Sequence, residues 1–487
     1  MLTRTSTQSL TGQLADRLAE RIRTRLLPPG ARLPSVRECA RQQGVSPYTV
    51  VAAYDQLLAQ GLVEARRQRG FYVRDAAPVQ EGRLASRTNG THGTNGPDAI
   101  GMPAAIAVQM MASRVPADAS SLIRSMFHRP SDKPQPGMGV FPPDWMSSTF
   151  MPTAVRRMTS TAALQELSLQ YGEPAGDMSL RRSLSQKLVG INVPATPDQI
   201  VTTIGATHAL DIVSRTLLRA GDPVMVEEPG WALEFARLEA LGMRILPVPR
   251  RADGPDLEVM AQYCKLHSPK LFVSVSVLHN PTGYSLTPGS AHRVLKLANE
   301  HDFHVVEDDT YSHLAPEHAT RLSALDGLQR TIYVSGFAKI LAPNWRIGFL
   351  AAPPALKERL LETKLLATLT SPTLFERALS WCIDQGQLRR HSERVRIRLD
   401  GARGRAVKLA MSHGCTFASE PAGLFGWVDT GVDTDALTQR MLDQGYLLAP
   451  GSLFHARRPP STMMRINFAT SQDATFWKVF SKVRDEL

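Results

Sequence analysis

Residues 331–353, "TIYVSGFAKILAPNWRIGFLAAP", place one lysine, Lys339, and one arginine, Arg346, among aliphatic and aromatic neighbours. The runs "TIYVSGF" and "RIGFLAAP" predict two strands that are apolar on both alternating faces, as in a sheet covered by helices. Ligands of such sheets bind at the carboxyl ends of the strands. Lys339 follows the end of the first strand, so it is either a functional amine or an ordinary solvated residue of a connection.

The chain before this stretch alternates short apolar runs with helical patterns. Further strands are predicted at "QIVTTIG" (199–205), "DPVMVEE" (222–228), "KLFVSVSVLH" (270–279) and "DFHVVEDD" (302–309). A helix is predicted over 207–221, ending at Gly221, and another over 287–302, where Thr287-Pro288 supplies cap and first-turn chemistry. This alternation predicts an α/β fold with a largely parallel sheet.

Length and charge indicate a second, different domain. The 487 residues exceed what one core usually organises. Residues 1–75 contain twelve arginines and no lysine against six acidic residues, and so hold about half of the net charge of +11. This excess indicates a polyanion partner, although a solvated basic face or a small docking domain is the plainer alternative.

Several classes of protein are not expected. No run reaches the roughly 18 apolar residues of a membrane helix, and the N-terminus lacks an apolar signal core, so we expect a cytoplasmic protein without a membrane partner. The four cysteines and thirteen histidines show no metal-binding spacing. The acidic run 307–309 is an alternative magnesium site, but no second acidic cluster accompanies it, and we expect no metal.

The first 75 residues predict three helices and a hairpin. An apolar stripe with a spacing of four predicts the first helix; its members are Leu10, Leu14, Leu18, Ile22 and Leu26. A short second helix stops at Gly44, and a third is capped by Ser46. The hairpin "LVEARRQRGFYV" carries three arginines near its tip. Together these elements predict a winged helix-turn-helix over 1–75, in which the third helix lies in the major groove of DNA.

The stretch "LPSVRECARQQGVSPYTVVAAYDQLLAQGLVEARRQRGFYV" resembles the GntR-type winged-helix domain. The resemblance implies double-stranded promoter or operator DNA as a partner. It also implies a set of contacting residues in the second helix, at the start of the third, and in the wing: Arg37, Ser46, Tyr48, Thr49, Arg66, Arg67, Arg69 and Gly70. Pro47 and Val51 stand where many members of that family have polar or basic residues.

Residues 76–118 are expected to form a flexible linker. The part up to Asp98 is rich in Gly, Asn, Thr and Pro and can bury little apolar surface. A more apolar stretch toward Met126 is either a further tether or a docking helix. The second domain is expected to occupy 119–487.

A set of polar residues at consecutive strand ends resembles the pyridoxal 5'-phosphate site of fold-type I aminotransferases: Asn280, Asp308, Tyr311, Lys339 and Arg346. Covalent attachment of an aldehyde cofactor requires a primary amine, and Lys339 fits that role. A carboxylate must keep the ring nitrogen protonated, and Asp308 fits. The resemblance implies a mostly parallel sheet and a smaller α+β subdomain over about 355–487.

The same resemblance assigns residues to the rest of the cofactor. Asn280 and Tyr311 would bond the phenolic oxygen, and Trp231 would cover the ring, with packing in the core as its alternative role. The turn before Ala206 and Thr207 would offer amides to the phosphate. Arg346 would bind the phosphate, together with Tyr171 of a neighbouring subunit. Gly336 stands where relatives have serine, so one hydroxyl is missing unless Ser335 replaces it.

Arg465, in "STMMRINFA", matches the arginine that holds the substrate carboxylate in these enzymes, although a structural ion pair is its alternative role. Both halves together resemble the MocR subfamily of transcription regulators. This implies a domain-swapped homodimer that senses PLP, an amino acid, an amine or a B6 vitamer. The competing hypotheses are an active PLP-dependent aminotransferase with a DNA-binding head, because nothing excludes turnover, and a degenerate domain that only dimerises.

Overall fold

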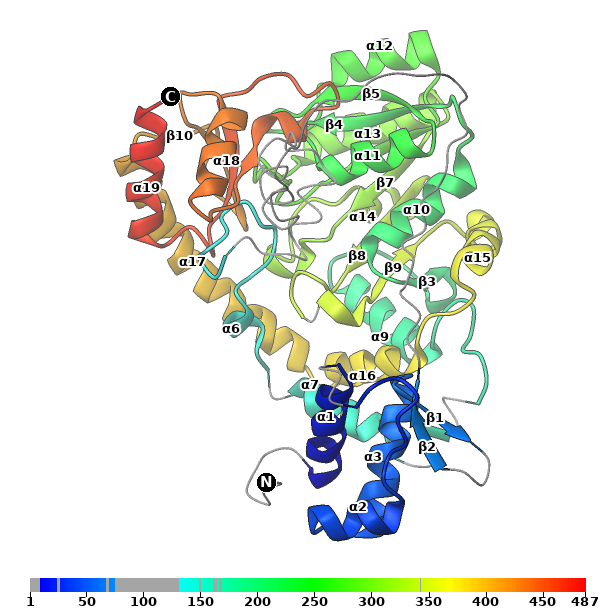
Figure 1. Cartoon of the computed structure of the whole chain (residues 1–487). Coiled ribbons are helices and arrows are strands. Elements are labelled where there is room, and N and C mark those ends of the chain that lie inside the picture. The colour runs from blue at the N-terminus through cyan, green and yellow to red at the C-terminus, as the bar shows by residue number, and fades with distance from the viewer. Residues whose placement is uncertain are drawn as a thin grey trace, which may run out of the picture. The chain divides into compact units, whose positions relative to one another are not determined.

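The computed structural model describes residues 9–23, 27–66, 70–74, 131–148, 150–160, 164–165, 169–341 and 343–487. The chain forms two compact units, Met1–Gly101 and Met102–Leu487, and each is described by itself. Figure 1 labels their helices and strands. The expected linker, 76–118, lies outside the described residues, and its bounds stay a prediction.

The first unit contains the three predicted helices and the predicted hairpin: α1 (Leu10–Arg23), α2 (Val36–Gln43), α3 (Pro47–Ala59), β1 (Val63–Arg66) and β2 (Gly70–Val73). The apolar stripe of α1 supplies Leu14 and Leu18 to a core shared with α3. Tyr54 of α3 is fully buried, and its hydroxyl donates to the Pro34 carbonyl at 2.9 Å. The antiparallel pair β1–β2 closes the unit, with Arg66 opposite Gly70.

The second unit is built on a seven-stranded sheet of order β3-β9-β8-β7-β6-β4-β5. The strands are β3 (Ile200–Thr203), β4 (Pro223–Glu228), β5 (Arg244–Pro249), β6 (Leu271–Ser274), β7 (His304–Asp308), β8 (Thr331–Gly336) and β9 (Gly348–Ala351). Strands β5, β4, β6, β7 and β8 pair in parallel, and β9 is antiparallel to both β8 and β3. The predicted largely parallel sheet is therefore confirmed.

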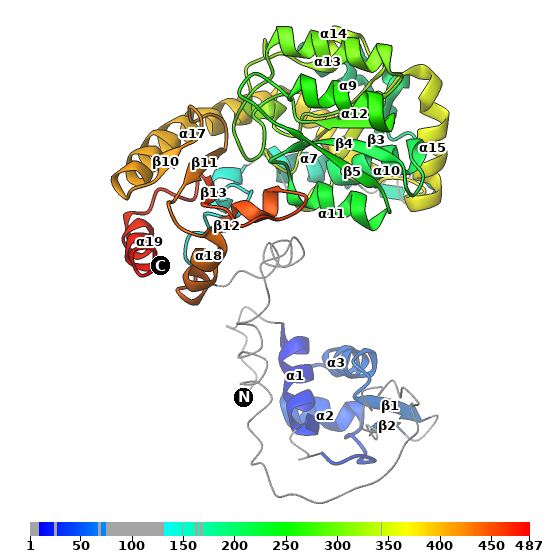
Figure 2. The same cartoon turned by 90° about the horizontal axis from the view of Figure 1, so that it is seen from above.

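Helices cover both faces of this sheet (Figure 2). One face packs on α10 (Ala206–Leu217), α11 (Ala232–Ala240) and α15 (Pro354–Thr368). The other face packs on α12 (Leu257–His267), α13 (Pro288–Glu300) and α14 (Leu322–Asp326). Neighbouring residues of one strand alternate between the two cores, as Val224 and Met225 of β4 do. Every strand of the centre must therefore be apolar on both sides.

Helix boundaries agree with the predictions at α13 but not at α10. The Thr287 hydroxyl accepts from the Ser290 amide at 3.3 Å and caps α13. Helix α10 ends at Leu217 rather than at Gly221. The predicted end is wrong because the Arg219 amide turns away to donate to the Asp222 carboxylate at 2.8 Å.

A four-stranded antiparallel sheet of order β10-β11-β13-β12 forms a smaller layer near the C-terminus. Its strands are β10 (Thr416–Phe417), β11 (Phe425–Asp429), β12 (Ala449–Pro450) and β13 (Met463–Asn467). The segment 131–141, far away in sequence, packs on this sheet: the Gly137 amide donates to Leu447 and the Asn467 amide to Pro136. The remaining helices are α6 (Pro143–Met146), α7 (Phe150–Met158), α9 (Met178–Val189), α16 (Thr373–Asp384), α17 (Gln387–Ser412), α18 (Thr434–Asp443) and α19 (Ala474–Asp485).

Candidate functional site

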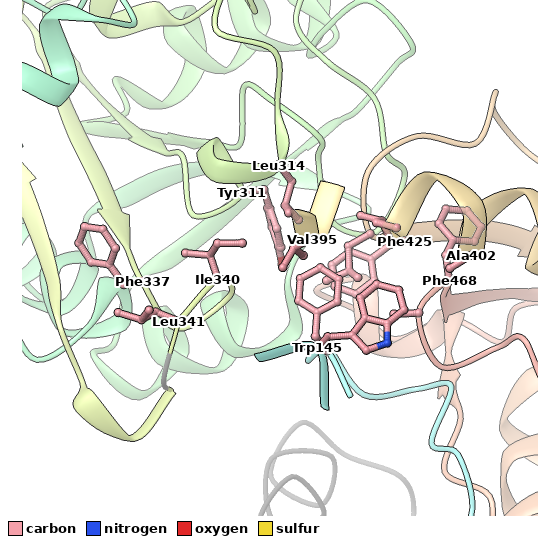
Figure 3. Packing of buried hydrophobic residues seen from close by; sticks show 14 of the residues in the cluster. Trp145, Tyr311, Leu314, Phe337, Ile340, Leu341, Val395, Ala402, Phe425 and Phe468 are labelled. Carbon is pink, nitrogen blue, oxygen red and sulfur yellow. The ribbon is translucent and has the colours of Figure 1, made fainter. Parts of the chain in front are cut away.

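Lys339 lies in the turn after β8, where its apolar neighbours enter the core. Phe337, Ile340 and Leu341 are buried in one cluster with Tyr311 and hold the turn in place (Figure 3). The Lys339 Nζ donates to the Gly139 carbonyl at 2.8 Å. Burial, assisted by the positive charge of Arg465, lowers the pKa of Lys339 to about 8. A lysine so placed is partly neutral near physiological pH and can act as a nucleophile.

Asp308 lies at the carboxyl end of β7, next to β8 in the sheet. Burial raises the pKa of Asp308 to about 6, although the Thr310 amide, at 3.1 Å, and hydroxyl donate to its carboxylate. Three residues later Tyr311 is buried, and burial also raises its pKa. The Asn280 side chain bonds the Tyr311 hydroxyl. Strand order and register therefore bring the predicted carboxylate, phenol and amide to one edge.

Arg465, on β13, joins the smaller sheet to this edge. It is 1% exposed; its Nη1 donates to the Asn280 side chain at 3.0 Å and its Nη2 to the Gly137 carbonyl at 2.5 Å. Its Nε has no partner among the described residues. Burial lowers the pKa of Arg465 to about 10, and Tyr311 acts in the opposite direction. No described carboxylate forms a salt bridge with Arg465, which argues against the structural ion pair.

Aromatic side chains surround the guanidinium of Arg465. Its Cζ lies 4.4 Å from the ring centre of Phe425, 5.1 Å from that of Phe454 and 5.5 Å from that of Trp231. Trp231 is half-buried at the N-terminal end of α11. The arginine, the aromatic cover and Lys339 are thus close: a Cβ on Gly139 would lie 3.6 Å from the lysine Nζ and 3.9 Å from the arginine Nη1.

The start of α10 forms a narrow concave turn suited to an anion. Gly205 has φ +85° and gives the helix no side-chain cap, so the first amides, those of Ala206 and Thr207, stay available. The Arg346 Nη2 donates to the Ile204 carbonyl at 3.0 Å. A Cβ on Gly205 would lie 2.6 Å from that guanidinium. The positive φ favours glycine at this position, and the turn places two amides and one arginine side by side.

Two further glycines, Gly336 and Gly348, form the wall of this turn. They face each other across β8 and β9. A Cβ on Gly348 would lie 2.6 Å from the Ala206 amide nitrogen, whereas one on Gly336 would lie 3.3 Å from it. The Ser335 hydroxyl donates to the Asp309 carbonyl at 2.9 Å inside the core. The suggestion that Ser335 replaces the missing hydroxyl is therefore wrong, since its side chain is engaged elsewhere.

Tyr171 is separate from this group. Its side chain is 83% exposed, and it donates no hydrogen bond to any described residue. Its assignment to a neighbouring subunit stays a prediction.

The residues of the acidic run 307–309 have different hydrogen-bond partners. Glu307 accepts the Leu322 and Ser323 amides at 2.7 and 2.8 Å at the start of α14. Asp309 accepts from the Arg321 Nε at 2.6 Å. In the part of the chain that the structure describes, no three acidic, histidine or cysteine side chains are grouped as a metal site would require. No helix there is long and apolar enough to cross a membrane.

A buried network that the sequence does not reveal supports the loop of Asn280. Glu227, at the end of β4, accepts from the Arg250 Nη1 at 2.5 Å and from the Val275 amide at 2.9 Å. The His279 ring lies 3.5 Å from the same carboxylate. Glu227 thus fixes the loop one residue before Asn280. The residues of this network lie on or after three separate strands, β4, β5 and β6, so their spacing in the sequence does not predict it.

The N-terminal unit brings four of the predicted DNA-contacting residues to its surface. Ser46 caps α3, where its hydroxyl accepts the Thr49 amide at 3.2 Å and shares a 2.9 Å hydrogen bond with the Thr49 hydroxyl. Tyr48 is 82% exposed. Arg37 is exposed on α2, the preceding helix. The two helices thus present a hydroxyl cap, an aromatic ring and a cation together.

The hairpin adds a basic edge. The Arg66 guanidinium lies 4.5 Å from the ring centre of Tyr72, and Gly70 has φ +100°. Arg32, which was not predicted, also belongs here, since a Cβ on Gly70 would lie 3.5 Å from its Nε. In the sequence, Arg32 is marked only by its position shortly before Ser35, the N-cap of α2. Two predicted wing residues lie outside the described residues: Arg67 and Arg69.

Both halves match known families. The aminotransferase class I and II family matches residues 138–482, well over half of the chain. The chain belongs to this family. Bacterial regulatory proteins of the gntR family match residues 10–73, so the aminotransferase domain follows a GntR helix-turn-helix domain. The resemblance to MocR-type regulators is therefore confirmed.

Both regulators and aminotransferases are similar to this chain. The uncharacterized HTH-type transcriptional regulator YdcR of Escherichia coli K12 is 27% identical over 94% of each chain. The probable rhizopine catabolism regulatory protein MocR of Rhizobium meliloti is 28% identical over 79% of this chain and 73% of its own. A kynurenine aminotransferase structure from Pyrococcus horikoshii, in complex with PMP, is 25% identical, with a TM-score of 0.68 over 77% of this chain and 96% of the other. The confirmed fold is that of fold-type I aminotransferases.

The aminotransferase family implies pyridoxal 5'-phosphate, and the residues present fit this group. The aldehyde would meet an amine of lowered pKa in Lys339, and the pyridine nitrogen would meet a carboxylate in Asp308. The phosphate would lie at the uncapped start of α10, beside Arg346. The cradle between Gly205 and Arg346 is one that a single Cβ would fill. The aminotransferase domain thus retains a donor or acceptor for each polar part of the cofactor.

Proposed function

We propose that this protein is a cytoplasmic transcription regulator that binds promoter DNA through its GntR domain and senses PLP, or an amino-acid-like effector, through its aminotransferase domain. One observation carries the proposal. The half-buried Lys339, with a pKa of about 8, and the buried Arg465, with an unpartnered Nε, belong to the same chain as an arginine-rich helix-turn-helix. Transamination has no use for a DNA-binding head, whereas a regulator needs a ligand pocket.

The chain's own residues would hold PLP in defined ways. When bound, PLP supplies an aldehyde for amines and an electron-withdrawing ring. Lys339 offers the amine, and Asp308 holds a proton on the ring nitrogen. Tyr311 and Asn280 donate to the phenolic oxygen and tune the basicity of the lysine nitrogen. Arg346 would neutralise the charge of the phosphate.

Arg465 would bind the effector. Its planar guanidinium matches a carboxylate, and its burial among three aromatic rings strengthens that pairing by excluding water. Amino acids carry the required carboxylate beside an amine that can compete with Lys339. Amines and B6 vitamers lack this carboxylate and would depend on the remaining residues of the site.

We also infer a homodimer with domain-swapped heads. Tyr171 and Leu169 expose 83% and 80% of their surface in a single chain. Large apolar residues so exposed favour burial against a partner. In a dimer Tyr171 would reach the phosphate turn of the other subunit.

Turnover is a second candidate function, because the residues it needs are all present: the half-buried Lys339 and Asp308 and the buried Arg465. An active aminotransferase would convert a supplied amino acid to its keto acid. A regulator would bind the same amino acid without accumulating product. Keto-acid formation, measured with excess PLP and an acceptor, separates the two.

The test follows the near-visible absorption of the lysine-bound cofactor and binding to the protein's own upstream DNA in one titration. Candidate amino acids, amines and B6 vitamers are added in turn. The sensor hypothesis expects one class to change the band and the DNA affinity together. A colourless protein that never acquires the band would instead support a domain that only dimerises. A band that responds while DNA binding stays constant would contradict sensing.

A further inference from the structure

We propose that α3 of the GntR domain reads DNA through apolar contacts with the C5-methyl groups of thymine, made by Tyr48 and Val51. This inference rests on the DNA binding proposed above and extends it to the chemistry of the base edge.

The exposed face of α3 is well defined by its buried face. Val50, Ala53, Tyr54 and Leu57 are fully buried against the rest of the unit. With 3.6 residues per turn, these positions fix the opposite face as the one that carries Tyr48, Val51, Ala52 and Asp55. Tyr48 is 82% and Val51 42% exposed. The first two turns of the outward face are therefore apolar.

Helix α3 contains no lysine or arginine, and its single charged residue is Asp55. A bidentate contact with guanine, the commonest specific contact of a recognition helix, requires Arg or Lys and is not available from α3. Asp55 repels phosphate and cannot anchor the helix to the backbone. The side chains of α3 therefore supply neither a bidentate guanine contact nor a cationic phosphate contact.

Positive charge flanks α3 instead. Arg37 is exposed on α2 and Arg32 lies beside Gly70. Arg66 lies against Tyr72 in the hairpin and is half-exposed, although Glu64 accepts from its Nε at 2.8 Å. Such cations bind phosphates and set the position of a protein on the duplex without reading sequence. An uncharged face between flanking cations matches a groove between two phosphate strands. This charge distribution favours DNA over a protein as the partner of the apolar face.

The hydroxyls of two residues near the start of α3, Ser46 and Thr49, are engaged. The hydroxyls of Ser46 and Thr49 bond each other, and Ser46 also accepts the Thr49 amide. Among the base edges of the major groove, the thymine methyl is the apolar group. Tyr48 and Val51, one turn apart on a helix that enters this groove by its N-terminal residues, can cover such methyls. Thymine is therefore the base that this face selects.

The experiment uses the full-length protein and two duplex libraries with the same randomised centre, one made with thymine and one with uracil in its place. Sites enriched from the thymine library are resynthesised with uracil at single positions. Burial of one methyl is expected to contribute about fourfold in affinity. Loss of the methyl at one or more thymines should weaken binding of the unmodified protein by about that factor.

Variants test whether Val51 causes the preference for thymine over uracil. Val51→Ala removes two methyl groups and should reduce the preference for thymine over uracil at the position that Val51 faces, while the preference at the position that faces Tyr48 remains. Arg37→Ala should weaken thymine and uracil sites by the same factor. Since Val51 is 42% exposed, Val51→Ala does not disturb the core. Equal binding of thymine and uracil sites by the unmodified protein, or an undiminished methyl preference in Val51→Ala, would overturn the inference. A thymine library that yields no enriched site would overturn DNA binding itself, which is a separate failure.

Discussion

Gly336 is predicted to limit how tightly the turn before α10 holds the phosphate of PLP. A Cβ at this position would lie 3.3 Å from the Ala206 amide nitrogen, 3.4 Å from the Ile347 carbonyl and 3.6 Å from the Ala206 Cβ. These distances are tight, but a shift of a few tenths of an ångström relieves them. Gly336 does not have a positive φ, so other residues fit its backbone. Gly336→Ser and Gly336→Ala can therefore both fold and form a matched pair.

The two variants isolate one hydroxyl. Both add the same Cβ and suffer the same crowding, and serine alone adds a donor directed at the turn of Ala206. A hydrogen bond to a charged group contributes about 1.5–3 kcal/mol. Gly336→Ser should therefore bind PLP about ten- to one hundredfold more tightly than Gly336→Ala. The unmodified protein should lie between them if crowding costs less than the hydroxyl contributes.

The assay is a titration of the apoprotein in phosphate-free buffer, followed by the absorption of the bound cofactor. Pyridoxal, which lacks the phosphate, serves as the control ligand and should not distinguish serine from alanine. Equal PLP affinities for the two variants would refute the assignment of the phosphate to this turn. An equal gain for pyridoxal would show that the hydroxyl acts on another part of the ligand.

Further predictions concern the remaining site residues. Lys339→Ala should lack the near-visible band, and a band in this variant would contradict the assignment. In the unmodified protein, the rate at which the band appears should rise with pH around a midpoint near 8, because burial lowers the pKa of Lys339 and the neutral amine is the reactive form. A midpoint near 10.5 would contradict this. Arg346→Ala should weaken PLP by at least about tenfold but leave pyridoxal unaffected in the same titration. Arg465→Lys keeps the charge but loses the fork, so amino acids should lose affinity while the corresponding decarboxylated amines do not. Arg37→Ala should lower the slope of log affinity against log salt by about one, and an unchanged slope would favour the docking-domain alternative.

The central strands of the sheet could be predicted from the sequence because each of them packs against a core on both faces and is therefore apolar throughout. Strand β5 could not be predicted in this way. Its sequence "RILPVP" contains two prolines, which argue against a central strand. It lies at the edge of the sheet and pairs only with β4, so one side of it needs no amide donors. Position in the sheet, which the local sequence does not encode, decides whether proline is tolerated.

Residues at strand ends could be assigned because parallel strands bring their carboxyl ends to one edge. Asp308 and Lys339 follow neighbouring strands, and the sequence shows both. The contacts of Gly137 and Gly139 could not be foreseen. Both precede the first strand of the large sheet, and the bond from Lys339 to Gly139 spans 200 residues. Glycine carbonyls also carry no side-chain signal, so only the folded path of 131–141 reveals them.

These glycine carbonyls change how the effector position should be understood. The sequence presents Arg465 as a free fork, but its Nη1 and Nη2 already donate to Asn280 and to the Gly137 carbonyl. A carboxylate that took both of these donors would have to displace a segment that is anchored to the smaller sheet through Leu447 and Asn467. The Nε has no described partner and is fully desolvated. A carboxylate that binds Arg465 would therefore have to displace either one of these two acceptors or the atoms packed around the Nε.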